Sequence, residues 1–265
     1  MSGRPPKSGP LAGRGAVVTG GGRGIGAAVA RALAAAGAAV VVAARTGGEI
    51  EAIAAALRAG GATARAVACD VTDELSVRAL GKAARDTLGI VDIVVNNAGL
   101  GSSAPVARLA LEDWRRALDV IATGTFLCTR EFLPDMLARR WGRVVQVASS
   151  AALEGARYVA HYAAAKHAVV GFTRSLALEL AGTGVTANAV CPGYVDTPMT
   201  EATLAAVSKH TGRDRVAALA SVLASANQSR LLSPEEVAAE VVRLCGNDSG
   251  GVNGEAIRLV PGGRP

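Results

Sequence analysis

Residues 16–26 read AVVTGGGRGIG, a short apolar run that passes directly into a glycine-rich turn. The next residues, to Ala36, have the alanine-rich character of a helix. A strand, a glycine turn and a helix in this order bind the diphosphate of a dinucleotide, because the free N–H groups and the positive dipole end at the helix N-terminus face the anion. The alternative is a flexible loop in a glycine-rich protein. The residues expected to form this cradle are Gly20, Gly22, Arg23, Gly24, Ile25 and Gly26.

Short β-branched segments alternate with longer amphipathic ones along the chain. Strands are predicted at 16–19, 39–43, 63–68, 93–96, 143–148, 185–190 and 256–259, and helices at 25–36, 48–59, 73–88, 111–138, 159–181 and 234–245. Apolar strands that alternate with helices predict an α/β fold, a single doubly wound parallel sheet (Rossmann-type, about seven strands) with helices on both faces. Ligands are expected at the carboxyl ends of its strands.

The domain organisation follows from the same pattern. We expect residues 1–13 to be a disordered basic tail and residues 14–265 to be one catalytic domain. Residues 198–230 interrupt the alternation and are mixed and partly polar, which indicates a helical insertion, or lid, over the site.

Composition excludes several classes of protein. The net charge is +6, but three basic residues near the N-terminus, Arg4, Lys7 and Arg14, leave +3 (6 − 3) for the rest, and only 3% of residues are aromatic. A nucleic-acid surface is therefore not expected. The four cysteines have no metal or redox spacing, the three histidines have no metal-ligand pattern, and no apolar run is long enough for a membrane span. We expect a soluble cytoplasmic protein with reduced cysteines and no metal.

Cofactor choice is expected to depend on the end of the second strand. An acidic residue there favours NAD, and an arginine suits the additional phosphate of NADP. The sequence has Arg45 and Thr46 at this point, and Arg23 in the glycine turn adds a second guanidinium group. Two cations and a hydroxyl favour NADP(H) over NAD(H). The alternative is a pair of solvated surface arginines.

Two further strand ends are expected to face the cofactor. Asp70 and Val71 follow the third strand, and Asn97, Ala98 and Gly99 follow the fourth. A carboxylate at the first position can accept from the adenine amino group, and small residues at the second let the backbone pass close to a ribose.

A serine, a tyrosine and a lysine supply the chemistry. Tyr162 and Lys166 are four residues apart in a predicted helix and therefore share a face, and Ser149 ends the fifth predicted strand. A free phenol has a pKa near 10, and we expect the ammonium and an oxidised nicotinamide to lower it. Ser149 would then hydrogen-bond a substrate carbonyl.

In these residues the chain resembles the short-chain dehydrogenase/reductase family over roughly residues 14–263. Four motifs match in order: 19–26, 96–99, Ser149 with Tyr162 and Lys166, and 192–197. The resemblance implies an NAD(P)-dependent oxidoreductase in which Tyr162 exchanges the proton, Ser149 orients the substrate, and Lys166 binds the nicotinamide ribose and lowers the pKa of the tyrosine. It also implies a homotetramer built on helices 111–138 and 159–181. Cofactor contacts are further implied at Pro192, Gly193, Val195 and Thr197, and substrate contacts at Ser149, Leu153 and Tyr194.

One position departs from the family pattern. Ile121 stands where the family usually has an asparagine, which helps to hold a local helix distortion and a proton-relaying water. We expect a weakened relay in an active enzyme.

Substrate and direction remain open at this stage. The general layout resembles 3-oxoacyl-thioester reductases, and Arg140 matches one basic carrier-docking position, whereas Thr183 replaces the arginine expected at another. The leading hypothesis is NADP-dependent reduction of a ketone, most of all a carrier- or CoA-linked 3-oxoacyl thioester. The alternatives are a secondary-alcohol dehydrogenase (steroid, polyol or cyclic alcohol) and a dinucleotide-binding regulator with little turnover.

Overall fold

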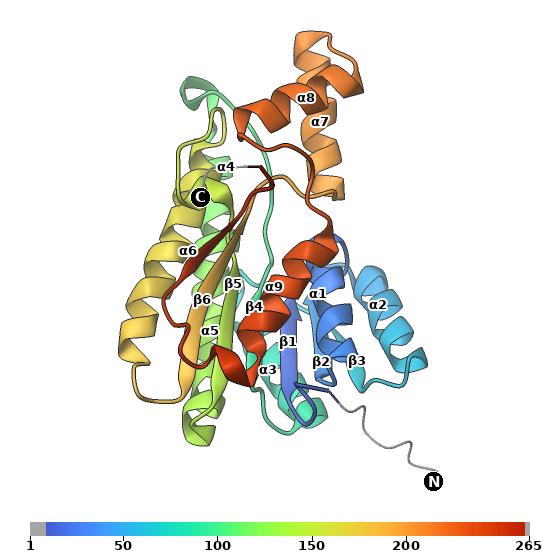
Figure 1. The fold of residues 1–265 in the computed structure, drawn as a ribbon, viewed down its shortest axis with the longest axis vertical. Helices are drawn as coiled ribbons and strands as arrows, with labels where there is room; N and C mark the ends of the chain where they lie inside the picture. The colour runs from blue at the N-terminus through green and yellow to red at the C-terminus, as the bar shows by residue number, and fades with distance from the viewer. Residues whose placement is uncertain (1–8, 263–265) are drawn as a thin grey trace.

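A computed structural model describes residues 9–262 of the chain (Figure 1). Its strands are β1 (Gly15–Thr19), β2 (Ala39–Ala44), β3 (Ala64–Ala68), β4 (Ile93–Asn96), β5 (Gly142–Val147), β6 (Val185–Pro192) and β7 (Ala256–Leu259). Its helices are α1 (Gly24–Ala35), α2 (Gly47–Ala59), α3 (Glu74–Leu88), α4 (Leu111–Ala117), α5 (Gly124–Arg139), α6 (Ala160–Glu179), α7 (Pro198–Thr211), α8 (Arg215–Ser225) and α9 (Pro234–Cys245). A six-residue π-helix, Leu118–Thr123, joins α4 to α5.

The strands form one parallel sheet in the order β3-β2-β1-β4-β5-β6-β7. The order reverses direction beside β1, so the glycine turn that follows β1 lies at the crevice where such sheets bind ligands. The predicted fold class and strand number are confirmed, with each strand displaced by no more than two residues at either end.

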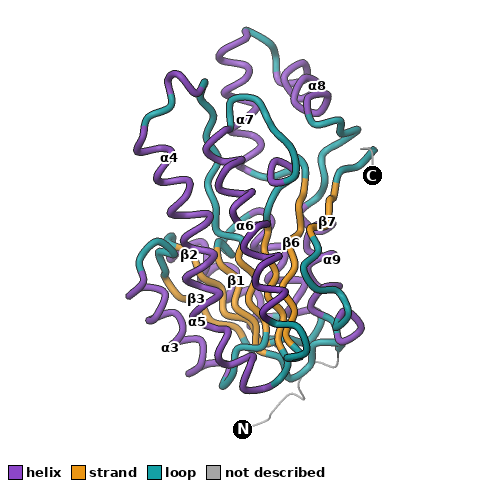
Figure 2. The backbone as a smooth tube through the Cα atoms, turned by 90° about the vertical axis from the view of Figure 1, so that its left-hand side faces the viewer, coloured by secondary structure: helices purple, strands orange, loops and turns teal. Residues whose placement is uncertain are grey.

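Side chains of successive strand residues enter opposite cores. Val18 of β1 packs in the core beneath α1, α2 and α9, whereas Val17 packs in the core beneath α3, α5 and α6. Both are fully buried. The alternation explains why these strands read as continuous apolar runs, since both faces of the sheet are covered (Figure 2).

The interruption at 198–230 is helical, as predicted. Thr197 caps the N-terminus of α7 by accepting from the backbone N–H of Thr200, and Pro198 occupies the first helical turn. Figure 1 shows α7 and α8 projecting beyond the carboxyl end of the sheet. The predicted helix 111–138 is found as three consecutive pieces from Leu111 to Arg139.

The predicted N-terminal tail was too long. Residues 1–8 lie outside the described residues, but the turn at 9–13 is folded against the core. Leu11 is 1% exposed and its N–H donates to the carbonyl of Ala36. The reason is that this leucine fills a space beside α1. Within residues 9–262 no helix is both long and apolar enough to cross a bilayer.

Candidate active site

The glycine turn is held in a shape that strongly favours glycine. Gly20 and Gly24 have φ angles of +62° and +51°, a region that residues with side chains rarely adopt. A Cβ on Gly26 would meet the carbonyl of Gly20, so the helix can approach the strand only with glycine there. Arg23, the N-cap residue of α1, makes no side-chain cap, and the first turn contains no acid. The N–H groups of this helix end, which begins with Gly24, Ile25 and Gly26, are thus available to an anion.

The fourth strand end braces this turn. The amide of Asn97 donates to the carbonyls of Thr19 and Gly20, each over 3.0 Å. The hydroxyl of Thr19 accepts from the N–H groups of Asn97 and Ala98, each over 3.1 Å. Asn97 therefore shapes the cradle through its amide, while Ala98 and Gly99 leave the adjoining strand end free of bulky groups.

The second strand end has the features expected of a phosphate site. Arg45 is exposed, and Thr46 is the N-cap residue of α2 without using its hydroxyl for a cap. Gly47 and Gly48 leave open space at the start of the helix. The Arg23 guanidinium lies 3.7 Å from the carboxylate of Glu49, which belongs to the first turn of α2.

A hollow of about 350 Å³ adjoins Arg45. Two arginines that the sequence reasoning missed, Arg115 and Arg116 of α4, line it together with Arg45. The remaining lining residues are Thr72, Glu112, Asp119 and Val120. Three guanidinium groups against two carboxylates leave this hollow positive. No local sequence signal marks the two α4 arginines, because their position depends on how the fold brings α4 near the segments that follow β2 and β3.

The third strand end is held by its own side chains. The carboxylate of Asp70 accepts from the N–H and the hydroxyl of Thr72 at 3.0 and 2.8 Å, and the first of these bonds lowers its pKa most. Val71 is buried beneath Gly124, the first residue of α5. Both residues lie at the edge where the other predicted cofactor contacts gather, and their role as contacts stays a prediction.

The predicted catalytic trio is brought together at the ends of β5 and α6. Ser149 caps the short 3₁₀ helix Ser150–Ala152 and makes a hydrogen bond with Tyr162, which is half-buried. The Nζ of Lys166 lies 5.7 Å from the centre of the Tyr162 ring. Lys166 is only 5% exposed, and its ammonium donates to the carbonyl of Val147 over 2.6 Å. A proton donor, a hydroxyl and a buried cation thus share one cleft.

The expected acidity of the phenol is not found in the chain's own groups. Burial raises the pKa of Tyr162, and the hydrogen bond with Ser149 opposes this only in part. The prediction that Lys166 and an oxidised nicotinamide together lower the pKa of the tyrosine stays a prediction, because it concerns the protein with its cofactor bound. Burial also lowers the pKa of Lys166 from 10.5 to about 8.

The helix distortion beside the trio persists without its usual asparagine. Ile121 lies inside the π-helix, is 1% exposed, and packs in a cluster with Ala165 and Val169 of α6. Leu153 and the ring of Tyr162 pack against the same cluster. Apolar packing thus replaces a polar group at this point.

The segment after β6 forms the base of the lid. Val195 forms a parallel bridge with Leu232, and the amide of Gln228 binds both backbone groups of Tyr194, accepting over 2.8 Å and donating over 2.7 Å. Gly193 adjoins the Gln228 side chain. Sequence reasoning missed Gln228, because no pattern in the adjacent sequence indicates that its amide is buried. The other residues predicted here, Pro192 and Thr197, lie at the end of β6 and at the start of α7.

The lid base also meets the glycine turn. A Cβ on Gly24 would lie 3.2 Å from the Cγ2 atom of Thr197, which places the first cofactor motif next to the last. Tyr194 packs against the buried lid residues Leu204, Ala218 and Val222. The predicted contacts after β1 and β6 therefore lie next to each other at the start of α7.

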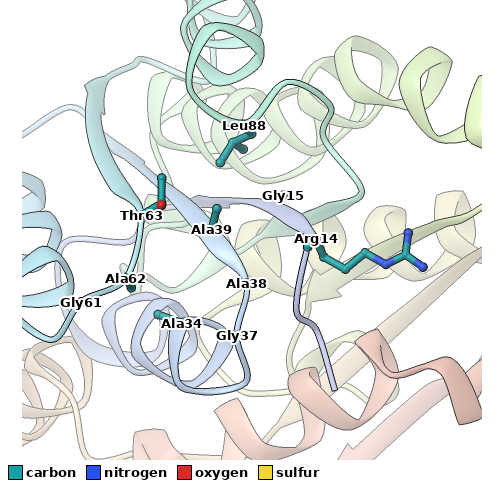
Figure 3. Close-up of a pocket in the computed structure, with 11 residues that line it drawn as sticks. Arg14, Gly15, Ala34, Gly37, Ala38, Ala39, Gly61, Ala62, Thr63 and Leu88 are labelled. Atoms are coloured by element: carbon teal, nitrogen blue, oxygen red, sulfur yellow. The ribbon is translucent and has the colours of Figure 1, made fainter. Parts of the chain in front are cut away.

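A second hollow, of about 230 Å³, lies at the opposite end of the sheet (Figure 3). Its lining includes Ala34, Gly37, Ala62 and Leu88, and the side chain of Arg14 extends away from it. That guanidinium stacks over Trp141 at 3.5 Å from the ring centre. Apart from Thr63 and Arg14, its lining residues carry no polar side chain. Among residues 9–262 no cluster of three or more His, Cys, Asp or Glu side chains is placed to hold a metal.

Fold and site together define a dinucleotide-binding oxidoreductase of the tyrosine–lysine type. The family model for short chain dehydrogenases matches residues 14–208. The chain belongs to the short-chain dehydrogenase family, which confirms the resemblance and the enzyme class expected from the motifs.

Similar proteins cover the chain almost from end to end. Short-chain reductase protein NovJ of Streptomyces niveus is 40% identical over 250 residues, which are 94% of this chain and 93% of the relative. A 3-oxoacyl-[acyl-carrier-protein] reductase, FabG of Aquifex aeolicus, is 36% identical over 94% of this chain and 96% of its own. A crystal structure of an actinorhodin polyketide ketoreductase variant with NADPH superposes with a TM-score of 0.91 at 36% identity, covering 97% of this chain and 98% of that one.

Proposed function

We propose that this protein reduces the ketone of a 3-oxoacyl thioester or a similar carbonyl compound with NADPH. One observation carries the proposal: the phenol of Tyr162 lies beside the buried ammonium of Lys166 and close to Ser149, at the ends of β5 and α6. A neutral phenol beside Ser149 is the form that donates a proton to a carbonyl oxygen, whereas alcohol oxidation requires the phenolate as a base. The name of the Aquifex aeolicus relative, a 3-oxoacyl-[acyl-carrier-protein] reductase, supports the same substrate class.

The site fits a phosphorylated dinucleotide. The cradle of β1 and α1 excludes any Cβ at Gly26 and offers uncapped N–H groups, and Arg45 and Thr46 stand where an additional phosphate is recognised. The two α4 arginines at the adjoining hollow add positive charge to this end. NADPH in the similar ketoreductase structure supports the choice. When bound, the reduced nicotinamide supplies the hydride that the carbonyl carbon accepts.

The chain's own groups then have separate tasks. The hydroxyl of Ser149 holds the carbonyl oxygen in hydrogen-bonding distance of Tyr162, and the phenol gives its proton to that oxygen as the alkoxide forms. Lys166 stays mostly protonated at neutral pH, because its pKa of about 8 lies above 7. The hydrogen bond from its ammonium to β5 keeps a positive charge next to the phenol while the proton leaves. The lid of α7 and α8 covers this crevice and excludes water.

The test is turnover by the purified protein with an acetoacetyl thioester and a panel of ketones, followed by the loss of reduced-nicotinamide absorbance. We expect NADPH-dependent reduction, and a fall in kcat of roughly 100-fold or more for Tyr162→Phe with unchanged NADPH binding. Binding of NADPH without turnover on any carbonyl would favour the regulator. Turnover confined to secondary alcohols with oxidised cofactor would favour the dehydrogenase.

We further propose a cytoplasmic homotetramer built on α5 and α6. Phe126 of α5 and Leu178 of α6 are 42% and 80% exposed, and Phe126 contacts Phe172 of α6 edge to face. Apolar side chains exposed on these two helices support burial against a second copy. Four free, buried cysteines support a reducing compartment. Light scattering of the wild type and of Leu178→Glu tests the assembly; a monomeric wild type would contradict it.

A further inference from the structure

The loop after β4, residues 100–105, is tied to the segment that precedes Tyr162. The Oγ of Ser102 lies 2.7 Å from the Nε2 of His161, and the N–H of Ala104 donates to the carbonyl of Tyr158 over 2.7 Å. Tyr158 has a φ of +66°, a value that residues other than glycine rarely adopt. Two hydrogen bonds and a constrained backbone thus fix this loop against the start of α6.

Ser102 stands at the mouth of the crevice. Leu100 packs against the cluster that holds the Tyr162 ring, and a Cβ on Gly101 would lie 3.0 Å from the Cγ of Met199 in the first turn of α7. The serine between these contacts is exposed. A substrate that enters between the lid and the catalytic tyrosine passes its hydroxyl.

The surroundings of His161 decide which way this hydrogen bond runs. The imidazole is fully buried, and among the described residues its Nδ1 atom has no hydrogen-bond partner. If Nε2 accepted the serine proton, Nδ1 would carry a buried N–H without an acceptor, which is rarer in proteins than an unpaired acceptor. Nε2–H therefore donates to Oγ, and the proton of the Ser102 hydroxyl is left to point elsewhere.

We propose that the Ser102 hydroxyl donates to a second oxygen of the substrate and that His161 positions it. A 3-oxoacyl thioester has such an oxygen, the thioester carbonyl two carbons from the ketone, whereas a simple ketone does not. The assignment rests on the proposed function and adds a selectivity for 1,3-dicarbonyl compounds. Ser149 and Tyr162 hold the reacting oxygen, and Ser102 holds the other.

The experiment compares two substrates, an acetoacetyl thioester and a cyclic monoketone, on the full-length protein. Ser102→Ala is expected to raise KM for the thioester about three- to tenfold, the range for one hydrogen bond, with little change in kcat and no change for the monoketone. His161→Leu should do the same, and His161→Gln, whose amide N–H can replace Nε2–H, should restore the wild-type KM. Ser103→Ala is the matched control, an exposed neighbouring serine expected to leave both substrates unchanged.

The outcomes separate this inference from the function on which it rests. A wild type that reduces neither substrate contradicts the proposed function itself. An active wild type whose Ser102→Ala variant loses equally on both substrates, or on neither, overturns the second-oxygen contact. Should His161→Leu fail to fold, as judged by circular dichroism, Ser102→Ala alone still decides the proposal.

Discussion

The ammonium of Lys166 donates to the carbonyl oxygen of Val147, the last residue of β5, over 2.6 Å. This lysine, which we propose to be catalytic, is therefore anchored to the sheet, and within residues 9–262 it forms no ion pair with a carboxylate. A backbone carbonyl offers only partial charge, so burial is left largely uncompensated and the pKa of Lys166 falls to about 8. The same contact fixes the amine one helical turn from Tyr162. The position of the ammonium and the destabilisation of its charged form therefore have the same cause.

This lowered pKa predicts a pH dependence of stability. Between pH 8 and 10.5 the unfolded chain holds a proton on Lys166 that the folded chain has released, so raising the pH in this window favours the folded state. The free energy of unfolding of the wild type minus that of Lys166→Met should rise by at most about 1.4 kcal/mol per pH unit there and stay flat below pH 8. Urea denaturation across this range measures it. A difference independent of pH would show that the lysine is not desolvated.

The glycine cradle predicts a sharp steric effect. Gly26→Ala would place a methyl group against the carbonyl of Gly20, which is backbone and cannot turn away. We expect dinucleotide affinity to fall by roughly 100-fold or more, because the N–H groups of the turn move out of register. Isothermal titration with NADPH measures the loss. Gly251→Ala, where a Cβ meets nothing within 4 Å, is the control; equal affinity in both variants would refute the cradle.

Cofactor preference is expected to depend on Arg45. Arg45→Ala removes a charge-assisted contact to the additional phosphate, which should raise KM for NADPH by about ten- to 100-fold and change KM for NADH little. Steady-state kinetics with both cofactors gives the ratio. Arg31→Ala provides a control, since that exposed arginine lies on α1 away from the strand end. An unchanged NADPH/NADH ratio would mean that Arg45 is only a solvated surface residue.

Ile121 gives a test in which activity and stability separate. Ile121→Asn buries an amide in the apolar cluster, which should lower the free energy of unfolding by about 1–3 kcal/mol. If the family's proton relay is weakened here, the same change should raise kcat or shift its pH profile. Thermal unfolding and turnover across pH measure the two effects. A destabilised variant with unchanged kcat and pH profile would rule out the relay.

The base of the lid depends on a single buried amide. Gln228→Ala would leave the N–H of Tyr194 without its partner and its carbonyl with only the N–H of Leu232, at a cost of about 1–3 kcal/mol for the buried orphan. We expect faster proteolysis within α7 and α8 and a lower kcat/KM. Asn227→Gly is the control, because that exposed neighbour has a φ of +50° that glycine adopts freely. Equal cleavage rates in the two variants would contradict this role.

The sheet could be predicted because its strands obey a simple rule. Val17 and Val18 are both buried on opposite faces, so β1 reads as a continuous apolar run, and the glycine turn then identifies the crevice. The spacing of Tyr162 and Lys166 similarly predicted a shared face. The burial of β1 and the shared face of Tyr162 and Lys166 both follow from local sequence and from the residue periodicities of strands and helices.

The remaining features depend on contacts between distant segments. The carbonyl that holds Lys166, the amide of Gln228 and the bond between Ser102 and His161 join residues separated by 19, 34 and 59 positions. The burial that raises the pKa of Tyr162 depends in the same way on how distant segments assemble. Sequence patterns indicate which residues belong to the same helix or strand. They say much less about which other helices and strands surround those residues in the fold.

The bridge between Val195 and Leu232 brings the two ends of the lid side by side at one point of the core. Residues between them can therefore change in length or character without disturbing the register of the sheet. The sheet and the proposed site residues thus form a constant scaffold, and α7 and α8 form a part that can vary. Grafting the corresponding segment of a relative between Thr197 and Gln228, with both residues kept, offers a direct route to new substrate preferences on the same scaffold.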